Sequence, residues 1–180
     1  MKSRVRQLDA AALKGEQRRV HDDIAAGPRG TVPGPFQIWL HVPEICDPAQ
    51  KLGAHLRYRT RLPPRLKELV ILVTARHWRA DFEWWAHEQE AIRAGLPADV
   101  IAAVAAGKEP KLTDPAERLA YDFATAYFAN KRVPAVLFEA AVERFGYEAT
   151  VELGSLLGYY SMVATILNVF EFPAPPHQMR

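Results

Sequence analysis

The densest group of chemically capable side chains lies in residues 77–88, whose sequence is HWRADFEWWAHE. Three of the four tryptophans and two of the six histidines fall within this segment. Glu83 and His87 are four residues apart, so a helix would bring both side chains to one face, with Trp84 bordering the same strip. Because burial and a neighbouring carboxylate can tune pKa values around neutrality, this group could transfer protons.

Two other interpretations of the Glu83–His87 pair stay open. An exposed helical ion pair of this spacing would contribute only about 0.2–0.5 kcal/mol to stability. A metal site would need more than two protein ligands, and the sequence has no HExxH pattern that would supply them. We therefore expect no metal ion here.

Glu68 lies in the apolar sequence LKELVILVTA (66–75) and could face either solvent or the interior. Facing solvent is the commoner orientation for a glutamate. If Glu68 faces inward, its charge needs a partner, because burying an unpaired carboxylate is costly. The helices expected on either side of residues 79–81 must form a hairpin or a sharp corner. His87 then becomes the natural partner of Glu68.

A basic cluster precedes Glu68, with no acidic residue inside it. It comprises Arg57, Arg59, Arg61, Arg65 and Lys67. These side chains could form an exposed surface or pair with acids of another subunit. One or two of them could instead receive a substrate carboxylate, for which guanidinium geometry is suited.

Two further residues could take part in chemistry but favour structural interpretations. His41 stands between an apolar turn and Pro43, where a histidine is more often packed in a core than catalytic. Cys46 is the single cysteine, so the chain holds neither an intrachain disulfide nor a CxxC site. No catalytic base is identifiable beside Cys46, and we interpret it as a small buried hydrophobe.

The elements that must position these residues are helices, because apolar residues recur at helical spacing almost throughout. We predict an all-α protein of roughly seven or eight helices. They cover about 9–26, 44 or 47 to 59, 62–78, 82–94, 97–106, 113–130, 134–146 and 147–168. Residues 27–35 (GPRGTVPGP) have the composition of a linker or an active-site approach. The apolar last helix is expected to be wrapped by other helices or buried between subunits.

Length and composition favour a soluble globular protein. The 180 residues are 49% hydrophobic and carry a net charge of +2, without the basic excess typical of nucleic-acid-binding proteins. No run of 18 apolar residues predicts a membrane span, and residues 1–30 lack the apolar core of a secretory signal. We therefore expect a cytoplasmic protein with an N-terminal helix and loop (1–33), a main domain (34–172) and an extended tail (173–180).

Residues 34–172 together resemble the carboxymuconolactone decarboxylase family, which shares its fold with the alkylhydroperoxidase D proteins. The resemblance rests on GPFQIWLHVPE (34–44), LPPRLKELVILVTARHW (62–78), FEWWAHE (82–88) followed by RAGLP, and ERFGYEATVELGSLLGYYSMVATILNVFE (143–171). It implies an alkylhydroperoxidase D-like helical bundle that forms a homo-oligomer, either a trimer or a hexamer.

The redox branch of this family carries the pattern Glu-x11-Cys-x2-Cys-x3-His. Counted from Glu68, the two cysteine positions hold Ala80 and Glu83, whereas the histidine position holds His87. Peroxide reduction by that route, the peroxiredoxin activity of the family, needs a thiolate and a resolving thiol and should be absent here. The segment is more similar to the decarboxylase-type branch.

That branch implies a carbon–carbon lyase without a cofactor, which removes CO2 from a small unsaturated lactone or organic acid in aromatic-compound catabolism. His87 would donate or shuttle the proton, Glu68 would orient His87, and Glu83 would be a second acid or base. Trp84 would shape the pocket, and His41 would bind the polar end of the substrate.

Two alternatives from other functional classes stay open. The first is a peroxidase-like oxidoreductase that relies on Cys46. The second is a non-catalytic oligomeric binding subunit, in which side chains would fill the space around Glu68 and His87. An accessible cavity at that point would favour a working site instead.

Overall fold

The computed structural model describes residues 3–175, which form nine α-helices, one short 3₁₀ helix and no β-strand. The 3₁₀ helix η1 covers Ala10–Ala12. The α-helices are α1 (Gly15–Ala26), α2 (Pro35–Trp39), α3 (Pro43–Tyr58), α4 (Pro64–Trp78), α5 (Asp81–Arg93), α6 (Ala98–Ala105), α7 (Pro115–Asn130), α8 (Ala135–Phe145) and α9 (Tyr147–Val169). The all-α prediction is therefore confirmed.

The helix count in this range exceeds the prediction because residues 36–39, the first part of a segment (36–42) expected as an apolar turn, form α2 together with Pro35. Proline at the first helical position favours this, since its φ is already helical and its missing N–H is not needed there. For the same reason α3 begins at Pro43 rather than at residue 44 or 47. The helix expected over 9–26 is divided, because Leu13 and Lys14 adopt extended conformations.

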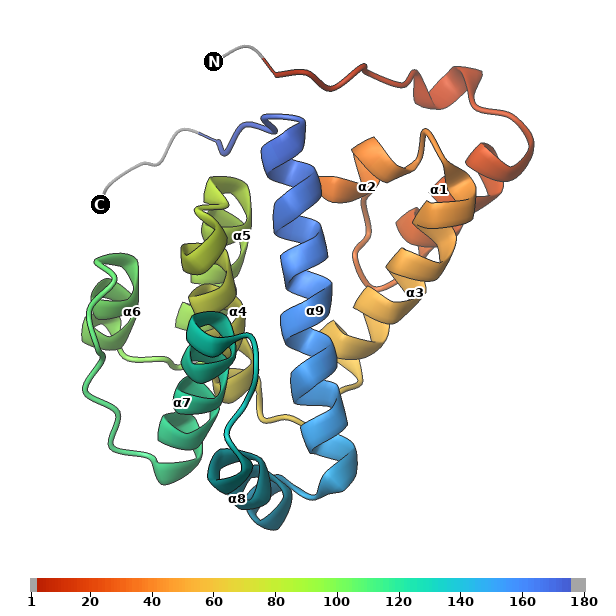
Figure 1. Cartoon of the computed structure of the whole chain (residues 1–180). Coiled ribbons are helices and arrows are strands. Elements are labelled where there is room, and N and C mark those ends of the chain that lie inside the picture. Colours follow the sequence, from red (N-terminus) through yellow and green to blue (C-terminus); the bar gives the residue numbers. More distant parts are fainter. Residues whose placement is uncertain (1–2, 176–180) are drawn as a thin grey trace.

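The core is built around α4, which contacts α5, α6, α7 and α9 (Figure 1). All ten residues from Leu66 to Ala75 are buried, including Glu68. A helix that is apolar on every side belongs in the interior, where other helices cover each face. This placement settles the orientation of Glu68, because α4 has no solvent-exposed face at that level.

The second long core element is α9, which runs between the α4–α5 pair and the α1–α3 group (Figure 1). By length and composition alone α9 could cross a membrane, with a mean hydropathy of 1.2 in its most apolar window. In this window 56% of the residues are buried inside the protein. The core helix of a soluble protein can have the same length and apolar composition. The burial predicted for the last helix is thus observed.

A two-residue connection joins α4 to α5. Arg79 adopts a left-handed conformation with φ of 51° and ends α4, and α5 begins at Asp81 after Ala80. The amide of Ala80 donates to the carbonyl of Ala75 at 3.0 Å, which tightens the corner. The hairpin returns α5 along α4 and so brings residues of 81–93 beside residues of 64–78.

The N-terminal segment packs onto the rest of the molecule. Val20 and Ile24 of α1 belong to the same hydrophobic core as residues of 34–172. Arg4 extends to the end of α9, where its amide donates to the carbonyl of Phe170 at 3.0 Å. Residues 173–175 have no regular secondary structure, and residues 176–180 of the predicted tail lie outside the described residues.

Candidate active site

Glu68, His87 and Glu83 form a continuous line of polar contacts inside the helical bundle. Nδ1 of His87 lies 2.7 Å from Oε2 of Glu68, and Nε2 lies 3.1 Å from Oε1 of Glu83. Each of the three residues is less than 5% exposed. The structure therefore brings together the three residues to which the family resemblance gave catalytic roles.

A buried lysine extends this line on the α4 side. Nζ of Lys67 lies 3.3 Å from Oε1 of Glu68 and donates to the carbonyl of Arg57 at 2.6 Å. Positive and negative groups consequently alternate from Lys67 through Glu68 and His87 to Glu83. Such alternation offsets the cost of burying charged groups, because each charge has an opposite neighbour.

The electrostatic surroundings keep His87 protonated at neutral pH. Burial by itself would lower the pKa of His87, but the hydrogen bonds and charges of Glu68 and Glu83 outweigh burial and raise this pKa to about 9. Burial likewise tends to raise the pKa of Glu68, and the contacts with His87 and Lys67 outweigh it and lower this pKa. His87 is thus an imidazolium that forms a hydrogen bond with Glu68 through Nδ1 and an ion pair with Glu83 through Nε2.

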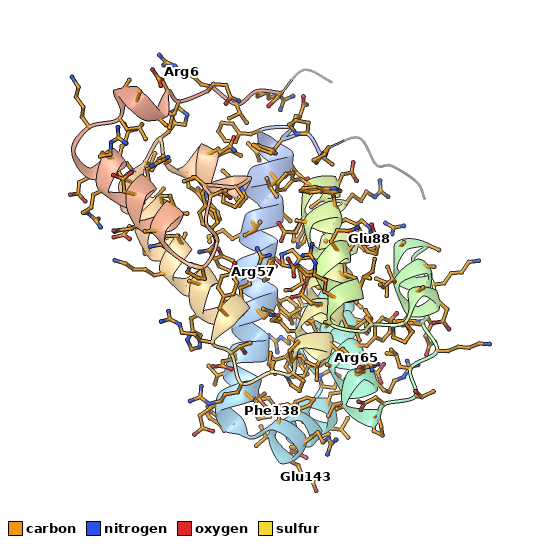
Figure 2. All side chains as sticks on the ribbon, turned by 180° about the vertical axis from the view of Figure 1, so that it is seen from behind. Arg6, Arg57, Arg65, Glu88, Phe138 and Glu143 are labelled. Atoms are coloured by element: carbon orange, nitrogen blue, oxygen red, sulfur yellow. The ribbon has the colours of Figure 1, made fainter. Side chains whose placement is uncertain are left out.

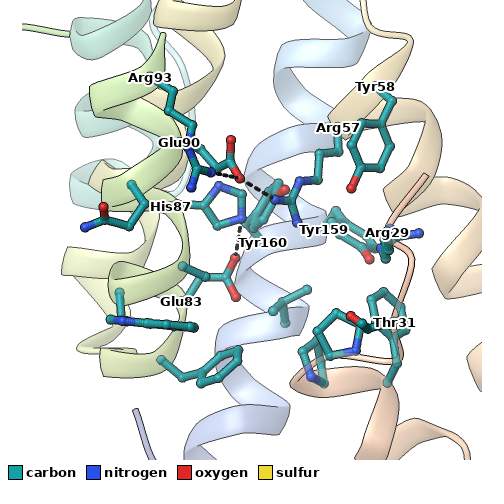
Figure 3. A pocket seen from close by; sticks show the side chains of 18 residues that line it. Arg29, Thr31, Arg57, Tyr58, Glu83, His87, Glu90, Arg93, Tyr159 and Tyr160 are labelled. Atoms are coloured by element: carbon teal, nitrogen blue, oxygen red, sulfur yellow. Dashed lines mark hydrogen bonds and ion pairs between the residues drawn. The ribbon is translucent and has the colours of Figure 1, made fainter. Parts of the chain in front are cut away.

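A cavity of about 320 Å³ opens beside this line (Figure 3). Glu83 and His87 line the cavity from α5, and Tyr159 and Tyr160 line it from α9. The ring of Tyr160 meets the His87 ring edge to face, with 4.9 Å between the ring centres. Glu68 is not among the lining residues, so it reaches the cavity only through His87.

The opposite wall of the cavity comes from α3 and from the loop that the sequence suggested as an active-site approach. Arg29 and Thr31 of that loop and Arg57 of α3 line the cavity. Figure 3 shows Arg29 on the far side of the cavity from His87. Of the two interpretations of this loop, linker or active-site approach, its place at the cavity favours the second, but its composition does not predict which loop residue lines the cavity.

Two residues expected at the site lie elsewhere. Trp84 lines a different surface depression, together with Ala75 and Arg76 of α4, and Trp85 lines the cavity instead. His41 is not among the cavity residues, and its Nε2 lies 2.8 Å from the carbonyl of Arg6.

The shift from Trp84 to Trp85 has a simple geometric reason. His87 lies at the border between the core and the cavity. Helical spacing places Trp84 on one side of His87, but it does not predict which side of the helix faces the cavity. Trp84 occupies the flank toward α4. Ala86 occupies the flank toward the cavity, together with Phe82 and Gln89.

The basic cluster separates into residues with different partners. Arg57 binds Glu90 at 3.1 Å, Arg61 binds Glu152 at 2.8 Å and Arg65 binds Glu117 at 2.8 Å. These acids belong to the same chain, so pairing with another subunit is not needed for these three. Within the cluster, Arg57 alone lines the described cavity.

Cys46 has the environment expected of a small hydrophobe. It is fully buried, and burial raises the pKa of its thiol to about 12. Cys46 is not among the residues that line the cavity. The thiolate that peroxide chemistry requires is therefore disfavoured at this position.

Sequence reasoning missed several cavity residues. Tyr159 and Tyr160 were assigned only to an apolar helix, and adjacent tyrosines on a core helix were the one available sign of a polar wall. Within residues 3–175, no group of three or more His, Cys, Asp and Glu side chains is arranged to hold a metal ion. Both ring nitrogens of His87 already contact carboxylates.

Comparison with known structures identifies the same architecture in several proteins. A peroxidase-related protein from Ralstonia eutropha, with an alkylhydroperoxidase AhpD core, superposes with a TM-score of 0.79 at 20% identity, over 97% of this chain and 93% of that chain. A putative antioxidant defence protein AhpD from Agrobacterium tumefaciens gives a TM-score of 0.69 at 19% identity, over 81% of this chain and 100% of that one.

A third similar structure is that of a debrominase. The debrominase Bmp8, as a Cys-to-Ala variant in complex with 2,3,4-tribromopyrrole, superposes with a TM-score of 0.70 at 16% identity, over 98% of this chain and 94% of that chain. At these identities the similarity establishes the fold alone. A search among curated proteins found no significant match.

The middle of the chain is similar in sequence to a known protein family. Residues 43–126, which include α3, α4, α5 and therefore Glu68, Glu83 and His87, match the model of the carboxymuconolactone decarboxylase family. The chain thus has an alkylhydroperoxidase D-like fold, and its residues 43–126 are similar to the carboxymuconolactone decarboxylase family.

Proposed function

We propose that this protein is a cofactor-free carbon–carbon lyase that decarboxylates a small unsaturated lactone or organic acid by acid–base chemistry. The observation that carries the proposal is the buried imidazolium of His87, which is held between Glu68 and Glu83 and lines a cavity of about 320 Å³. A positively charged ring beside a carboxylate is a proton donor already in its active form at neutral pH.

The reaction requires a proton at carbon. The bond between the substrate carbon and its carboxylate breaks, the electron pair moves into the conjugated carbonyl to give a dienolate, and CO2 leaves. A proton from the Glu83–His87 pair then forms the new C–H bond, and water returns a proton to His87. Glu68 acts through His87 as a positioning residue, because it keeps the ring oriented and charged without reaching the cavity.

Two observations weigh against the alternatives. The only thiol, Cys46, is fully buried with a raised pKa and does not line the cavity, which disfavours thiol-dependent peroxide reduction. A binding subunit without catalysis would have side chains filling the space beside His87, whereas a cavity large enough for a small acid lies there.

We propose also that the chain works in the cytoplasm as a trimer or a hexamer. Support comes from α9, whose outward side exposes Tyr147, Val151, Met162 and Val169. Apolar side chains that recur along one side of a helix are typical of a surface that another subunit covers.

The proposed activity can be tested with a panel of small unsaturated lactones and unsaturated dicarboxylic acids, with detection of released CO2. His87→Gln is expected to lower turnover about 100-fold or more, the usual scale of general acid catalysis. In D2O the product of the wild-type protein should carry deuterium at the carbon that lost CO2 or at a position conjugated with it.

Matched controls separate this proposal from the thiol alternative. Cys46→Ser should release CO2 at the wild-type rate, and Glu143→Gln, an exposed change at the far end of α8, should do the same (Figure 2). Equal turnover by the wild-type protein and His87→Gln would contradict the proposal, as would peroxide reduction that thiol alkylation abolishes.

A further inference from the structure

The side of the cavity opposite His87 holds an arginine without a carboxylate partner. Three arginines line the cavity, and two of them, Arg57 and Arg93, bind Oε1 of Glu90 at 3.1 and 2.9 Å. Arg29, in contrast, forms no ion pair with any residue of 3–175. Its charge therefore faces the cavity without a neutralising group.

Aromatic side chains hold the Arg29 guanidinium in place. Its central carbon lies 4.6 Å from the centre of the Phe36 ring and 5.8 Å from that of the Tyr58 ring. Gly53 of α3 leaves room mainly for Tyr159, whose hydroxyl would collide with a Cβ at this position, and such a Cβ would also lie 3.0 Å from Nη2 of Arg29. Stacking on rings uses the faces of a guanidinium and leaves its N–H groups available for hydrogen bonds.

The remaining cavity wall is partly apolar. Phe82, Trp85 and Val163 line the cavity together with the charged residues. Arg29, Arg57, Arg93 and the imidazolium of His87 outnumber Glu83 and Glu90, so the cavity favours an anionic ligand. A small planar carboxylic acid fits both the charge and the apolar wall.

We propose that Arg29 binds a carboxylate of the substrate, and that this carboxylate is the one that the reaction retains. The second part of this inference, that the carboxylate is retained, rests on the proposed decarboxylation. A guanidinium that binds the departing carboxylate would stabilise the ground state more than the transition state, in which that charge moves away. Arg29 therefore suits a second, unreactive carboxylate of the substrate.

The first test measures binding and needs no turnover. Benzoate, a planar carboxylate, is the probe, and benzamide is its neutral counterpart of the same shape. The wild-type protein should bind benzoate more tightly than benzamide. Arg29→Gln should weaken benzoate binding about 10-fold or more, the scale of a charge-assisted hydrogen bond, and leave benzamide binding unchanged.

Two variants make the comparison specific. Arg29→Lys keeps the charge but not the forked geometry, and should fall between wild type and Arg29→Gln. Arg59→Gln removes the same charge from an exposed neighbouring position that does not line the cavity, and should bind benzoate as the wild type does. Benzoate affinity that is equal in wild type and Arg29→Gln, or absent in wild type, would overturn the proposal.

The second test uses any acid that releases CO2. Arg29→Gln should raise KM about 10-fold or more with a much smaller change in kcat, because a retained carboxylate is bound equally before and during the reaction. A collapse of kcat at unchanged KM would overturn the assignment to the retained group. If benzoate binding depends on Arg29 but no acid releases CO2, the decarboxylase proposal fails while the carboxylate site stands.

Discussion

A buried histidine ring between two carboxylates favours a different protonation state from a buried histidine without such partners. In an apolar interior the neutral ring would be favoured, yet Glu68 and Glu83 together more than compensate for the burial of His87. The chemistry available to the site follows from this balance. The ring is therefore protonated across the neutral range.

The raised pKa of His87 predicts a loss of stability as the solution becomes alkaline. The unfolded chain releases this proton near pH 6.5, whereas the folded protein keeps it until about pH 9, so the folded state binds more protons in between. The free energy of unfolding should fall between pH 6.5 and 9, by up to about 1.4 kcal/mol per pH unit. Chemical denaturation at a series of pH values measures this slope.

His87→Gln provides the comparison for that slope. The variant should be less stable than wild type at pH 6.5, and its free energy of unfolding should change much less up to pH 9. Parallel pH profiles for the two proteins would show that His87 is not the group responsible.

The spacing of Glu83 and His87 could be predicted from sequence, because four residues on a helix share a face whatever the helix packs against. The orientation of Glu68 could not, since it depends on how many neighbours cover α4. The role of Arg29 could not be predicted from the sequence either. The loop composition indicated an approach to a site, but the aromatic contacts of Arg29 come from α2 and α3, which are set only by the tertiary fold.

At the scale of elements, the site depends on the corner between α3 and α4. Glu152 of α9 holds this corner through four groups, because its oxygens lie within 2.9 Å of the His55 ring, the Thr60 hydroxyl, and the amide and guanidinium of Arg61. The helix pattern predicted both flanking helices. It could not predict this contact, which joins residues more than 90 positions apart.

Glu152→Ala should destabilise the protein by about 2 kcal/mol or more, because several charge-assisted hydrogen bonds are lost. Burial tends to raise the pKa of Glu152, but the Arg61 amide, His55 and Thr60 outweigh it and lower this pKa to about 2. The contribution is therefore present above pH 4.5 and is lost as pH falls toward 2. Urea denaturation at pH 7 and pH 3 should give a larger difference from wild type at pH 7.

Glu143→Ala is the control for that experiment. Glu143 is exposed at the end of α8, away from Arg57 and the cavity (Figure 2). This variant should change stability by less than about 0.5 kcal/mol. If Glu152→Ala is equally mild, the α3–α4 corner does not depend on this carboxylate.

The loop before α2 offers a second test at this scale. Gly34 has φ of 42°, and a Cβ at this position would collide with the ring of Phe82, a cavity residue. Gly30 also has a positive φ, of 66°, but open space around it. Gly30→Ala should therefore cost about 1 kcal/mol from backbone strain alone, and Gly34→Ala clearly more.

Thermal denaturation and benzoate binding distinguish the two glycine variants. Gly34→Ala should also weaken benzoate binding, because Phe82 must move into or away from the cavity, whereas Gly30→Ala should not. Equal effects on stability and binding would mean that the loop does not approach Phe82 as closely as the structure indicates.

At the scale of the whole molecule, the two sides of α9 have different surroundings. One side is buried against α4, and the other exposes apolar residues along the helix. Apolar residues occur on more than one face of this helix, which predicts burial on more than one side. The sequence alone does not show which face another subunit would cover.

The exposed side of α9 predicts self-association. Sedimentation equilibrium should give a mass of three or six chains for the wild type. Met162→Glu should shift the population toward the monomer, because a charge would enter an apolar contact. Leu52→Glu, which places the same charge on an exposed residue of α3, should not. A wild-type monomer at micromolar concentration would contradict the proposal of a homo-oligomer.

The most direct test of the proton-donor assignment is an NMR titration of the His87 ring. The wild-type ring should be an imidazolium that loses its proton only near pH 9. Glu68→Gln should lower this pKa by about one unit or more, whereas Glu90→Gln, which removes a cavity carboxylate bound to Arg57 and Arg93, should leave it nearly unchanged. A wild-type ring that titrates near pH 6.5, or a pKa that Glu68→Gln does not lower, would contradict this assignment.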